Sequence, residues 1–333
     1  MWALSKKTSF FMTRLNLMLK IFSLMASLCF GSLWAAQPSL TTLVVPYSSG
    51  TGIDAVARII SPRLSEILGR PVLVENKAGA SGNIGADFVA KAKPDGSILM
   101  ITVNTFNVTP SIYKKLPYDP NTDFSPIGKI GVSNLALVIN SSFQAQSFEE
   151  LKTLIAQKPG VFNYSSSGSG TAQHLSMEVL KKRFGLDILH VPYKGATGAI
   201  TDLLGGQTQM MMMPVHTAMP LVRGGKIKLI AIAGDSRSSY APHVPALSEL
   251  GAGSLDLVVT FWMSGPAGLP AETVNQLSSG LKQILSVQEV KDQFNVQGII
   301  PEFSAPAALG EFIKRDIDRW KSFVKEQNLS FEP

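Results

Sequence analysis

Short apolar runs alternate with longer amphipathic segments along most of this chain. Leu43-Val44-Val45 and the run 97–103 have the length of buried strands, whereas apolar positions between Val56 and Leu68 recur at helical spacing. The same alternation returns over 188–213. Strands that alternate with helices are typical of parallel sheets with helices on both faces, so the pattern predicts an α/β fold.

Two extended apolar segments interrupt this alternation. Residues 127–139 are long enough to cross between two sheets, and residues 257–262 supply a return crossing. We therefore predict two lobes, each with a parallel-rich sheet and with C-terminal helices that complete the fold. The expected boundaries are 37–138 with 256–333 for the first lobe and 139–255 for the second.

Two loops of small polar residues resemble each other. Y-S-S-G-T-G at 47–52 follows the first predicted strand, and Y-S-S-S-G-S-G-T-A-Q-H at 164–174 follows an apolar run that ends at Phe162. A helix is expected after each loop, and N–H groups of its first turn, together with glycines that allow close approach, make an anion site. Ligands of such sheets bind beyond the carboxyl ends of the strands, so both loops are expected to face one cleft. Taken singly, each loop also fits a simple tight turn.

Nucleotide binding and serine hydrolysis find little support in the same residues. Gly168-Ser169-Gly170 lacks the Lys-Ser/Thr of a P-loop, and neither loop contains G-x-G-x-x-G. The chain has four histidines but no serine in a G-x-S-x-G elbow. Ser111 and Lys114 match S-x-x-K, but the segment reads as a proline-rich loop and no K-T-G follows. We therefore expect a binding protein rather than an enzyme.

Metal chemistry and cofactors are not expected either. No pair of histidines or carboxylates has ligand spacing, and His174 is expected to hydrogen-bond loop carbonyls. The run Met210 to Met213 is more typical of a buried strand than of a soft-metal site. Tyr193 and Lys194 fit two interpretations equally, either cleft wall and solvated lysine or ligand contacts.

The charge of the chain is concentrated at its N-terminus. The formal charge is +6, but four of the 30 basic residues lie before residue 37 and no acid does; without them 26 basic residues face 24 acidic ones. No polybasic patch remains, which excludes nucleic acid as the expected partner. Residues 1–36 read as a secretory signal peptide, with an uncleaved membrane anchor as the alternative. The single cysteine, Cys29, lies within that segment, so the mature protein is expected to have no disulfide.

The chain contains several ordered motifs: V-P-Y-S-S-G-T-G-I-D-A-V-A-R ending at Arg58, V-E-N-K-A-G-A-S-G-N-I-G-A at 74–86, A-K-P-D-G at 92–96, the loop at 164–175, H-V-P-Y-K-G at 190–195 and D-L-L-G-G-Q at 202–207. In these motifs and their order the chain resembles the Bug-type receptors, the extracytoplasmic solute-binding proteins of tripartite tricarboxylate transporters. The resemblance covers essentially the whole chain after the expected signal peptide.

The resemblance implies a two-lobed periplasmic binding protein, a type II-like Venus flytrap whose cleft holds a small carboxylate. In relatives the two loops grip one carboxylate, and ordered water meets the far end of the ligand. Membrane subunits of a transporter are the implied partners, and the receptor is expected to be a periplasmic monomer without a cofactor. The candidate ligand-binding residues are Tyr47, Ser48, Ser49, Gly50, Thr51, Gly52, Asp54, Asn104, Thr105, Ser166, Ser167, Ser169, Gly170, Thr171, His174, Tyr193, Gly195, Met212 and Met213.

Two departures from the family pattern bear on the ligand. Ser48 and Ser49 stand where relatives carry prolines, and Met212 and Met213 stand where relatives often carry Phe-Asp. The missing acid argues against a ligand with a fixed amine, and a methionine wall would accept an apolar or aromatic body. We therefore expect a dicarboxylate or an aromatic carboxylate. An orphan sensor in signalling remains an alternative to transport.

Overall fold

The structure is a computed structural model that describes residues 40–238, 240–252 and 258–326. The described residues belong to one compact unit that begins at Ser39. The expected signal peptide, with Cys29, lies outside the described residues. No helix in the described ranges is long and apolar enough to cross a membrane.

The first sheet combines a parallel part with antiparallel crossing strands. Strands β1 (Thr41–Val45), β2 (Val72–Asn76) and β3 (Ile98–Val103) run parallel, and β9 (Val258–Pro266), β4 (Phe124–Asn140) and β10 (Ile300–Ser304) join antiparallel in the order β2-β1-β3-β9-β4-β10. The sheet is therefore mixed, because the returning strand β9 runs antiparallel to both of its neighbours, β3 and the departing strand β4.

The second sheet grows from the far half of β4. Residues 124–134 of β4 pair with β9, whereas residues 135–140 pair with β7 (Met210–Pro214) and β8 (Ile227–Ile232). Strand β5 (Asn163–Ser166) lies parallel between β7 and the edge strand β6 (Leu189–Pro192). The expected crossing segment is thus confirmed as one 17-residue strand that both sheets share.

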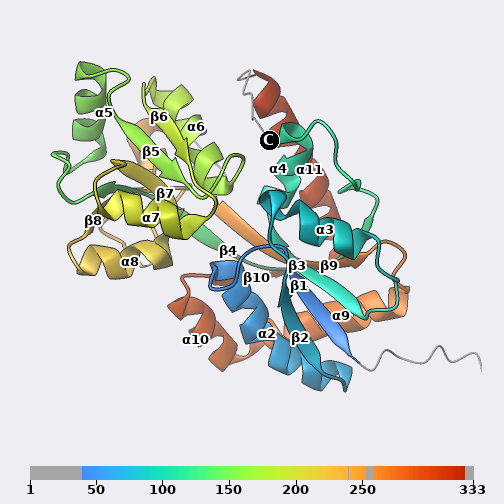
Figure 1. Ribbon diagram of the computed structural model, residues 1–333. Coiled ribbons are helices and arrows are strands. Elements are labelled where there is room, and N and C mark those ends of the chain that lie inside the picture. Colours follow the sequence, from blue (N-terminus) through green and yellow to red (C-terminus); the bar gives the residue numbers. More distant parts are fainter. Residues whose placement is uncertain (1–39, 239, 253–257, 327–333) are drawn as a thin grey trace, which may run out of the picture. The chain divides into compact units, whose positions relative to one another are not determined.

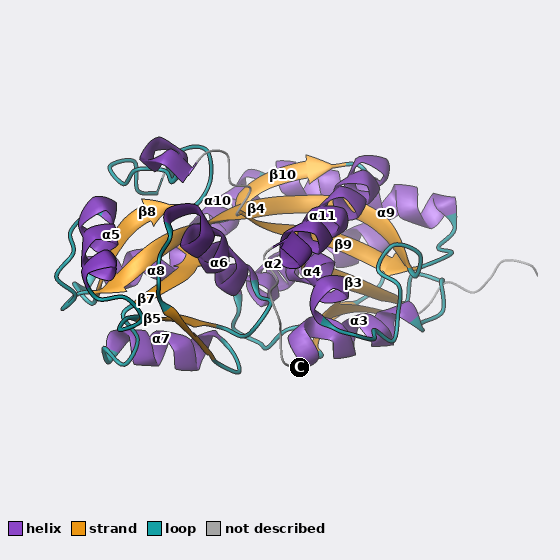
Figure 2. Ribbon diagram, turned by 90° about the horizontal axis from the view of Figure 1, so that it is seen from above, coloured by secondary structure: helices purple, strands orange, loops and turns teal. Residues whose placement is uncertain are grey.

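Helices cover both faces of each sheet (Figures 1 and 2). On the first sheet, α2 (Gly52–Leu68), α9 (Ala271–Ser286) and α10 (Gln288–Val296) pack on one face, and α3 (Asn83–Ala90), α4 (Thr105–Ile112) and α11 (Pro306–Glu326) pack on the other. On the second, α5 (Phe148–Gln157) and α6 (Ala172–Phe184) oppose α7 (Ala196–Leu204) and α8 (Val215–Arg223). Two short turns, Ala80–Gly82 and Ser248–Ala252, complete the described elements. The predicted α/β class is confirmed.

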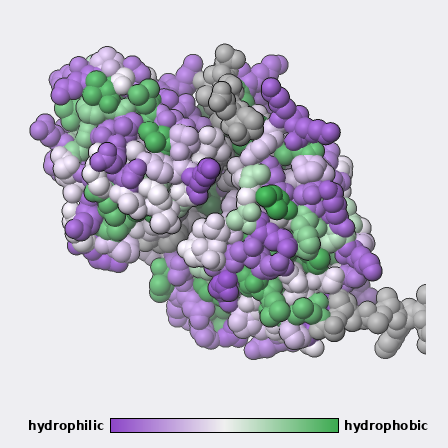
Figure 3. All heavy atoms as spheres, in the orientation of Figure 1, coloured by the Kyte–Doolittle hydropathy of each residue, from purple (hydrophilic) through white to green (hydrophobic). Residues whose placement is uncertain are grey.

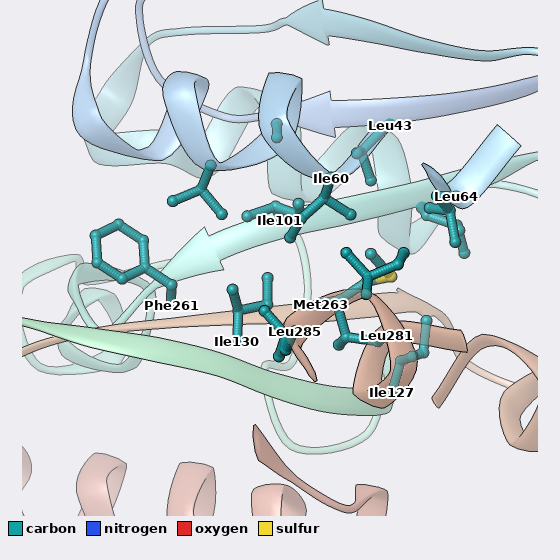
Figure 4. Close-up of a cluster of buried hydrophobic side chains, with 14 of the residues drawn as sticks. Leu43, Ile60, Leu64, Ile101, Ile127, Ile130, Phe261, Met263, Leu281 and Leu285 are labelled. Atoms are coloured by element: carbon teal, nitrogen blue, oxygen red, sulfur yellow. The ribbon is translucent and has the colours of Figure 1, made fainter. Parts of the chain in front are cut away.

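Side chains of each central strand alternate between two cores. Leu43 and Val45 of β1 face α2 and α9, whereas Val44 faces α3 and α11. Figure 4 shows the first of these cores, where Ile60 and Leu64 of α2 lie over the sheet. Each such side chain contributes roughly 1.5–3 kcal/mol when fully buried. The face seen in Figure 3 is mixed, with many polar and few apolar side chains.

Several element ends follow the expected local chemistry. Gly69 ends α2 at φ 63° and Gly185 ends α6 at φ 64°, a left-handed conformation that glycine adopts without strain. The Oγ of Ser147 accepts a hydrogen bond of 3.2 Å from the N–H of Glu150 at the start of α5. Glycine after a helix and Ser-x-x-Glu before one are sequence signals for such boundaries.

Other elements differ from the sequence predictions. Helices α4, α8 and α10 and strand β10 were not expected, and β5 begins at Asn163 rather than ending at Phe162. Pro110 and the β-branched residues give α4 a low helix propensity. The polar sequence N-Y-S-S of β5 lacks the apolar pattern of a buried strand. Ser111 consequently lies in the last turn of a helix, not in a proline-rich loop.

Candidate functional site

The first loop, Tyr47 to Gly52, joins β1 to the N-terminus of α2. Its tip is exposed, but Asp54 holds it from below. One carboxylate oxygen of Asp54 accepts from the Gly50 N–H at 2.9 Å and from Arg58 Nε at 3.0 Å, and the other accepts from Asn76 Nδ2 at 3.0 Å. The Asn76 amide also donates to the Tyr47 carbonyl at 3.0 Å. The loop is therefore tied to β2 and to its own helix.

This network corrects the role expected for Asp54. Its side chain is 6% exposed, and internal donors occupy both of its oxygens. Burial acts to raise the pKa of Asp54, but the hydrogen bonds from Arg58, Gly50 and Asn76 outweigh it and leave the pKa below the usual range. Asp54 thus positions the first loop and is not free to contact a ligand, and Arg58 offsets its charge.

The N-terminus of α2 is open above this support. Thr51 stands at the N-cap, but its Oγ1 donates to the Ser48 carbonyl at 2.8 Å and does not cap the helix. Among the described residues, the N–H groups of Gly52 and Ile53 have no acceptor. Such N–H groups point outward along the helix axis and favour an anion.

The second loop, Ser166 to Thr171, joins β5 to the N-terminus of α6 and folds on itself. Ser166 Oγ donates to the Gly168 carbonyl at 3.1 Å, and Thr171 Oγ1 donates to the same carbonyl at 2.8 Å. Thr171 also caps α6 through the N–H of His174 at 3.4 Å. Within the described part of the chain, the N–H groups of Ala172 and Gln173 have no acceptor. The second loop therefore offers an open helix N-terminus like that of the first.

Gly170 must be glycine for two reasons. Its φ is +76°, and a Cβ at this position would lie 2.3 Å from Cδ1 of Ile112 at the end of α4. The close approach links the second loop to the first lobe. The link continues to the first loop, because Tyr113 Oη donates to Ser81 Oγ at 3.2 Å and the neighbouring Gly82 packs on the Tyr47 ring.

Two stacked histidines support the second loop. Nδ1 of His174 accepts from the Gly170 N–H at 3.0 Å, and Nε2 of His190 lies 2.7 Å from Ser166 Oγ. The two rings are 3.9 Å apart and nearly parallel. His174 was expected to bond loop carbonyls; it accepts from a loop N–H instead, which requires an unprotonated Nδ1.

Both imidazoles are neutral near pH 7. Burial lowers the pKa of His174 to about 3, with help from His190 and Lys181. Burial also lowers the pKa of His190 to about 4, although Glu178 opposes this effect. The second loop therefore rests on neutral groups, and its positive potential comes from helix N–H groups.

The contact between Ser166 and His190 does not make a hydrolase. Ser166 is completely buried, and its hydroxyl is engaged with the Gly168 carbonyl and N–H, at 3.1 and 3.2 Å. A nucleophile must reach the substrate, and this oxygen does not. No group of His, Cys, Asp or Glu in the described ranges is arranged to hold a metal ion.

The remaining candidates divide into structural residues and residues near the loops. Asn104 Nδ2 donates to the Val258 carbonyl at 2.8 Å, so its amide fixes the start of β9, and the adjacent Thr105 is buried. Tyr193 donates its hydroxyl to Asp202 and leans on α7, which begins after Gly195. Its backbone, however, stays beside the second loop, because its N–H donates to the Ser166 carbonyl at 3.1 Å.

The expected methionine wall is corrected. Met212 and Met213 are both 0% exposed, and they belong to cores on opposite faces of the second sheet. The run 210–213 alternates between the two faces because β7 is covered on both sides. The side chains therefore fill the cores and do not line a ligand site.

Sequence reasoning missed two residues around the loops, Ile112 and Gln173, and it did not anticipate the buried hydroxyl of Tyr47, which it had named as a ligand candidate. Ile112 contacts Gly170, Gln173 Oε1 accepts from Ser167 Oγ at 3.1 Å, and Tyr47 has a buried hydroxyl without a hydrogen-bond partner of suitable geometry in the described residues. Burial raises the pKa of Tyr47 well above its usual value, although the neighbouring hydroxyls of Thr102 and Thr105 act to lower it. No sequence motif predicts these contacts, because each joins segments that are far apart in the sequence or depends on a side-chain rotamer.

Comparison with known proteins places this geometry in a family. Residues 56–329 match the TctC model, the tripartite tricarboxylate transporter family receptor. The chain belongs to this receptor family. BugT of Bordetella pertussis is 30% identical over 286 residues, covering 85% of this chain and 88% of BugT. A UPF0065 protein from the tcbD–tcbE intergenic region of Pseudomonas sp. (strain P51) is 31% identical over 291 residues, 87% of this chain and 86% of the relative.

Solved structures of similar proteins support the same family assignment. A protein of R. palustris determined with adipate is 30% identical, with a TM-score of 0.83 over 90% of this chain and 100% of that one. MatC from Rhodopseudomonas palustris, determined with bound malate, is 28% identical, with a TM-score of 0.78 over 86% of this chain and 99% of MatC. The Bug-type resemblance and the two-lobed binding-protein fold are thereby confirmed. The family consists of extracytoplasmic receptors for small carboxylates that work with transporter membrane subunits, and not of enzymes.

Proposed function

We propose that this receptor holds one carboxylate group of a small organic acid between its first and second loops and delivers the acid to a tripartite tricarboxylate-type transporter. The receptor is exported by the N-terminal signal peptide and acts as a monomer in the periplasm. Its two lobes close on the ligand, with the boundary near residue 135, where β4 leaves the first sheet.

The observation that carries this proposal is the pair of uncapped helix N-termini. Gly52 and Ile53 on α2, and Ala172 and Gln173 on α6, present N–H groups without acceptors among the residues described. An anion near one helix N-terminus gains about 0.3–1 kcal/mol, and up to about 2 kcal/mol when partly buried. Hydrogen bonds to a charged group contribute about 1.5–3 kcal/mol each. Two such termini are sufficient to bind a carboxylate without an arginine.

Hydroxyl groups at the loop tips add to these donors. Ser48 and Ser49 are exposed on the first loop, and Ser169 is half-buried on the second. In the described part of the chain none of these three hydroxyls is used in an internal hydrogen bond. They are the side chains that we assign to the ligand, whereas Ser166, Thr171 and Asp54 shape the loops.

The ligand class that we favour is a dicarboxylate. The relatives determined with adipate and with malate both hold diacids, and each shares more than a quarter of its residues with this chain. Met212 and Met213, the residues that suggested an aromatic body, both belong to the cores of the second sheet, which favours the diacid.

Thermal unfolding across a panel of organic acids tests the proposal. An acid present at about 100 times its Kd stabilises the folded protein by about 2.7 kcal/mol. We expect adipate, malate or a related diacid to raise Tm, and the Ser49→Ala/Ser169→Ala variant to lose affinity while its Tm without ligand stays the same. No shift with any mono-, di- or aromatic carboxylate would contradict the proposal. Binding without any uptake through membrane subunits would favour the sensor alternative.

A further inference from the structure

We propose that the groove between α9, α10 and β10 is the surface that docks on an acidic, apolar segment of the transporter's membrane subunits. The inference rests on the proposed delivery function and concerns a second surface of the receptor. None of the residues that line the groove belongs to the first or the second loop.

The groove is lined by apolar, polar and basic residues and has a volume of about 360 Å³. The apolar residues are Leu285, Pro301 and Phe303, and the polar and basic ones are Lys282, Ser286, Gln288, Lys291 and Asn295. This volume accommodates one or two side chains of a partner, and it lies at the lower end of the usual range for ligand pockets, about 300–1,000 Å³.

One exposed apolar side chain stands next to a lining residue in the chain. Val296 at the end of α10 follows Asn295 and is 80% exposed, more than any other large apolar side chain that the structure describes. Burial of such a side chain contributes roughly 1.5–3 kcal/mol. Apolar residues that are surrounded by polar ones are typical of a binding surface.

The charges around the groove select an acidic partner. Lys282 and Lys291 have no ion-pair partner among the described residues, whereas the nearby Glu289 pairs with Arg63 and Glu302 pairs with Lys129. Asp292 accepts from the amide of Gln288 at 2.9 Å. The groove lining therefore carries two lysines without an ion pair and no carboxylate, which favours approach of a carboxylate-bearing segment, although the charge of the neighbouring Asp292 reduces this effect.

A second copy of this chain fits the groove poorly. A two-fold interface would place lysines against lysines near its axis. In the described ranges β10 pairs only with β4, but Pro301 removes a donor from its outer edge, and a bulge lies between Pro301 and Ser304. The edge is therefore unsuited to extending the sheet into another copy.

The position of the groove suits a transporter subunit. Asn295 on its rim accepts a hydrogen bond of 3.3 Å from Tyr240 Oη. Tyr240 packs on the core of α7 and α8 in the second lobe. A subunit bound in the groove therefore lies beside a contact between the two lobes. Closure of the lobes on a ligand changes the surface that this subunit contacts.

Site-specific photo-crosslinking in intact cells of the source organism tests this inference. A photoreactive residue replaces Val296, and another replaces Val161 on the second lobe, which is 64% exposed, as the positional control. We expect Val296 to give an adduct that mass spectrometry identifies as a membrane subunit of a tripartite tricarboxylate transporter. The Lys282→Glu/Lys291→Glu variant is expected to lower this adduct about tenfold, equivalent to 1.4 kcal/mol.

Matched controls separate this inference from the proposed function. Lys158→Glu/Lys226→Glu reverses two exposed lysines elsewhere and is expected to leave the adduct unchanged. Both charge variants are expected to bind adipate like the unmodified receptor. Absence of a membrane-subunit adduct at Val296, an adduct with a second copy, or an adduct that persists in Lys282→Glu/Lys291→Glu overturns the docking surface. Failure of the unmodified receptor to bind adipate or any other panel acid counts against the proposed function instead.

Discussion

The first and second loops carry similar residues but rest on different supports. Below the first loop, the carboxylate of Asp54 accepts hydrogen bonds from the Gly50 N–H, the Arg58 guanidinium and the Asn76 amide. Below the second, the neutral imidazoles of His174 and His190 hold Gly170 and Ser166. One loop is thus fixed by a charged network and the other by neutral rings. The difference shows that two loops of similar sequence can be held in place by unrelated neighbouring groups.

The two supports also respond to different changes. An ion-paired carboxylate stays ionised near neutral pH, whereas a buried imidazole stays neutral. We therefore expect the loops to be separable by mutation and by acid. The following predictions run from the largest expected effect to the smallest.

Substitution of Gly170 by alanine is expected to weaken carboxylate binding most. The new Cβ meets Ile112 and adopts φ +76°, so either the second loop or α4 must move. We expect affinity to fall about tenfold or more, equivalent to at least 1.4 kcal/mol. Calorimetric titration measures this loss.

Two further variants isolate the cause of that loss. Gly185→Ala has a similar φ of +64° but nothing within 4 Å, so it costs about 1–2 kcal/mol of stability and leaves affinity unchanged. Gly170→Ala/Ile112→Ala removes the clash and is expected to regain much of the affinity. Equal affinity for Gly170→Ala and the unmodified receptor would refute a fitted contact at Ile112.

Acid is expected to destabilise the second loop's support. The pKa of His174, about 3, and that of His190, about 4, lie below the unfolded value of 6.5. The unfolded chain therefore binds protons that the folded chain does not. This contribution to stability is complete above pH 6.5 and is lost as pH falls toward 4 and then 3, by about 1.4 kcal/mol per unit for each fully shifted histidine.

Urea denaturation at pH 7.5 and pH 5.0 checks this expectation. We expect the unmodified receptor to lose about 2–4 kcal/mol more than the His174→Gln/His190→Gln variant, with the smaller share from the partly exposed His190. His243→Gln, at an exposed site, serves as the control. The same pH dependence in all three proteins would mean that the stacked pair does not determine acid sensitivity.

Asp54→Asn should affect the first loop more modestly. The NH2 group that replaces one carboxylate oxygen faces a donor, either the Asn76 amide or the Gly50 N–H with Arg58, and the ion pair with Arg58 is lost, which costs about 1–3 kcal/mol of stability. Affinity is expected to fall severalfold, by calorimetry. Glu289→Gln breaks a surface pair with Arg63 and should cost less than about 1 kcal/mol. Similar effects for both variants would show that Asp54 is not a special support.

Met213→Leu is expected to change least. Met213 lies in the core with α7 and α8, and a swap of similar volume costs less than about 1.5 kcal/mol. Ligand affinity should stay the same, because the side chain does not reach the loops. A change in affinity without a change in Tm would return Met213 to the ligand site.

Prediction from the sequence was most successful for helices whose own residue pattern determines the helix. The C-terminal helix α9 (Ala271–Ser286) could be expected because its apolar positions repeat at helical spacing. Helix α4 was missed because Pro110 and β-branched residues give no such signal, and contacts with α11 stabilise it instead. Local periodicity therefore predicts elements with strong patterns and fails for elements that packing imposes.

The candidate site shows the same limit. Both loops could be found from their serines and glycines, but the role of Asp54 depends on Asn76, which lies 22 residues away. His190 reaches Ser166 only because β5 and β6 pair in the second sheet. The methionines at 212 and 213 looked like a variable wall, and only the sheet shows that alternation sends them into two cores.

A crystal structure with the acid that gives the largest thermal shift tests the central claim most directly. The account predicts that one carboxylate accepts hydrogen bonds from backbone N–H groups of both loops, at the N-termini of α2 and α6, with Ser49 and Ser169 beside it. A carboxylate held by lysine or arginine side chains, or by one loop alone, would contradict it.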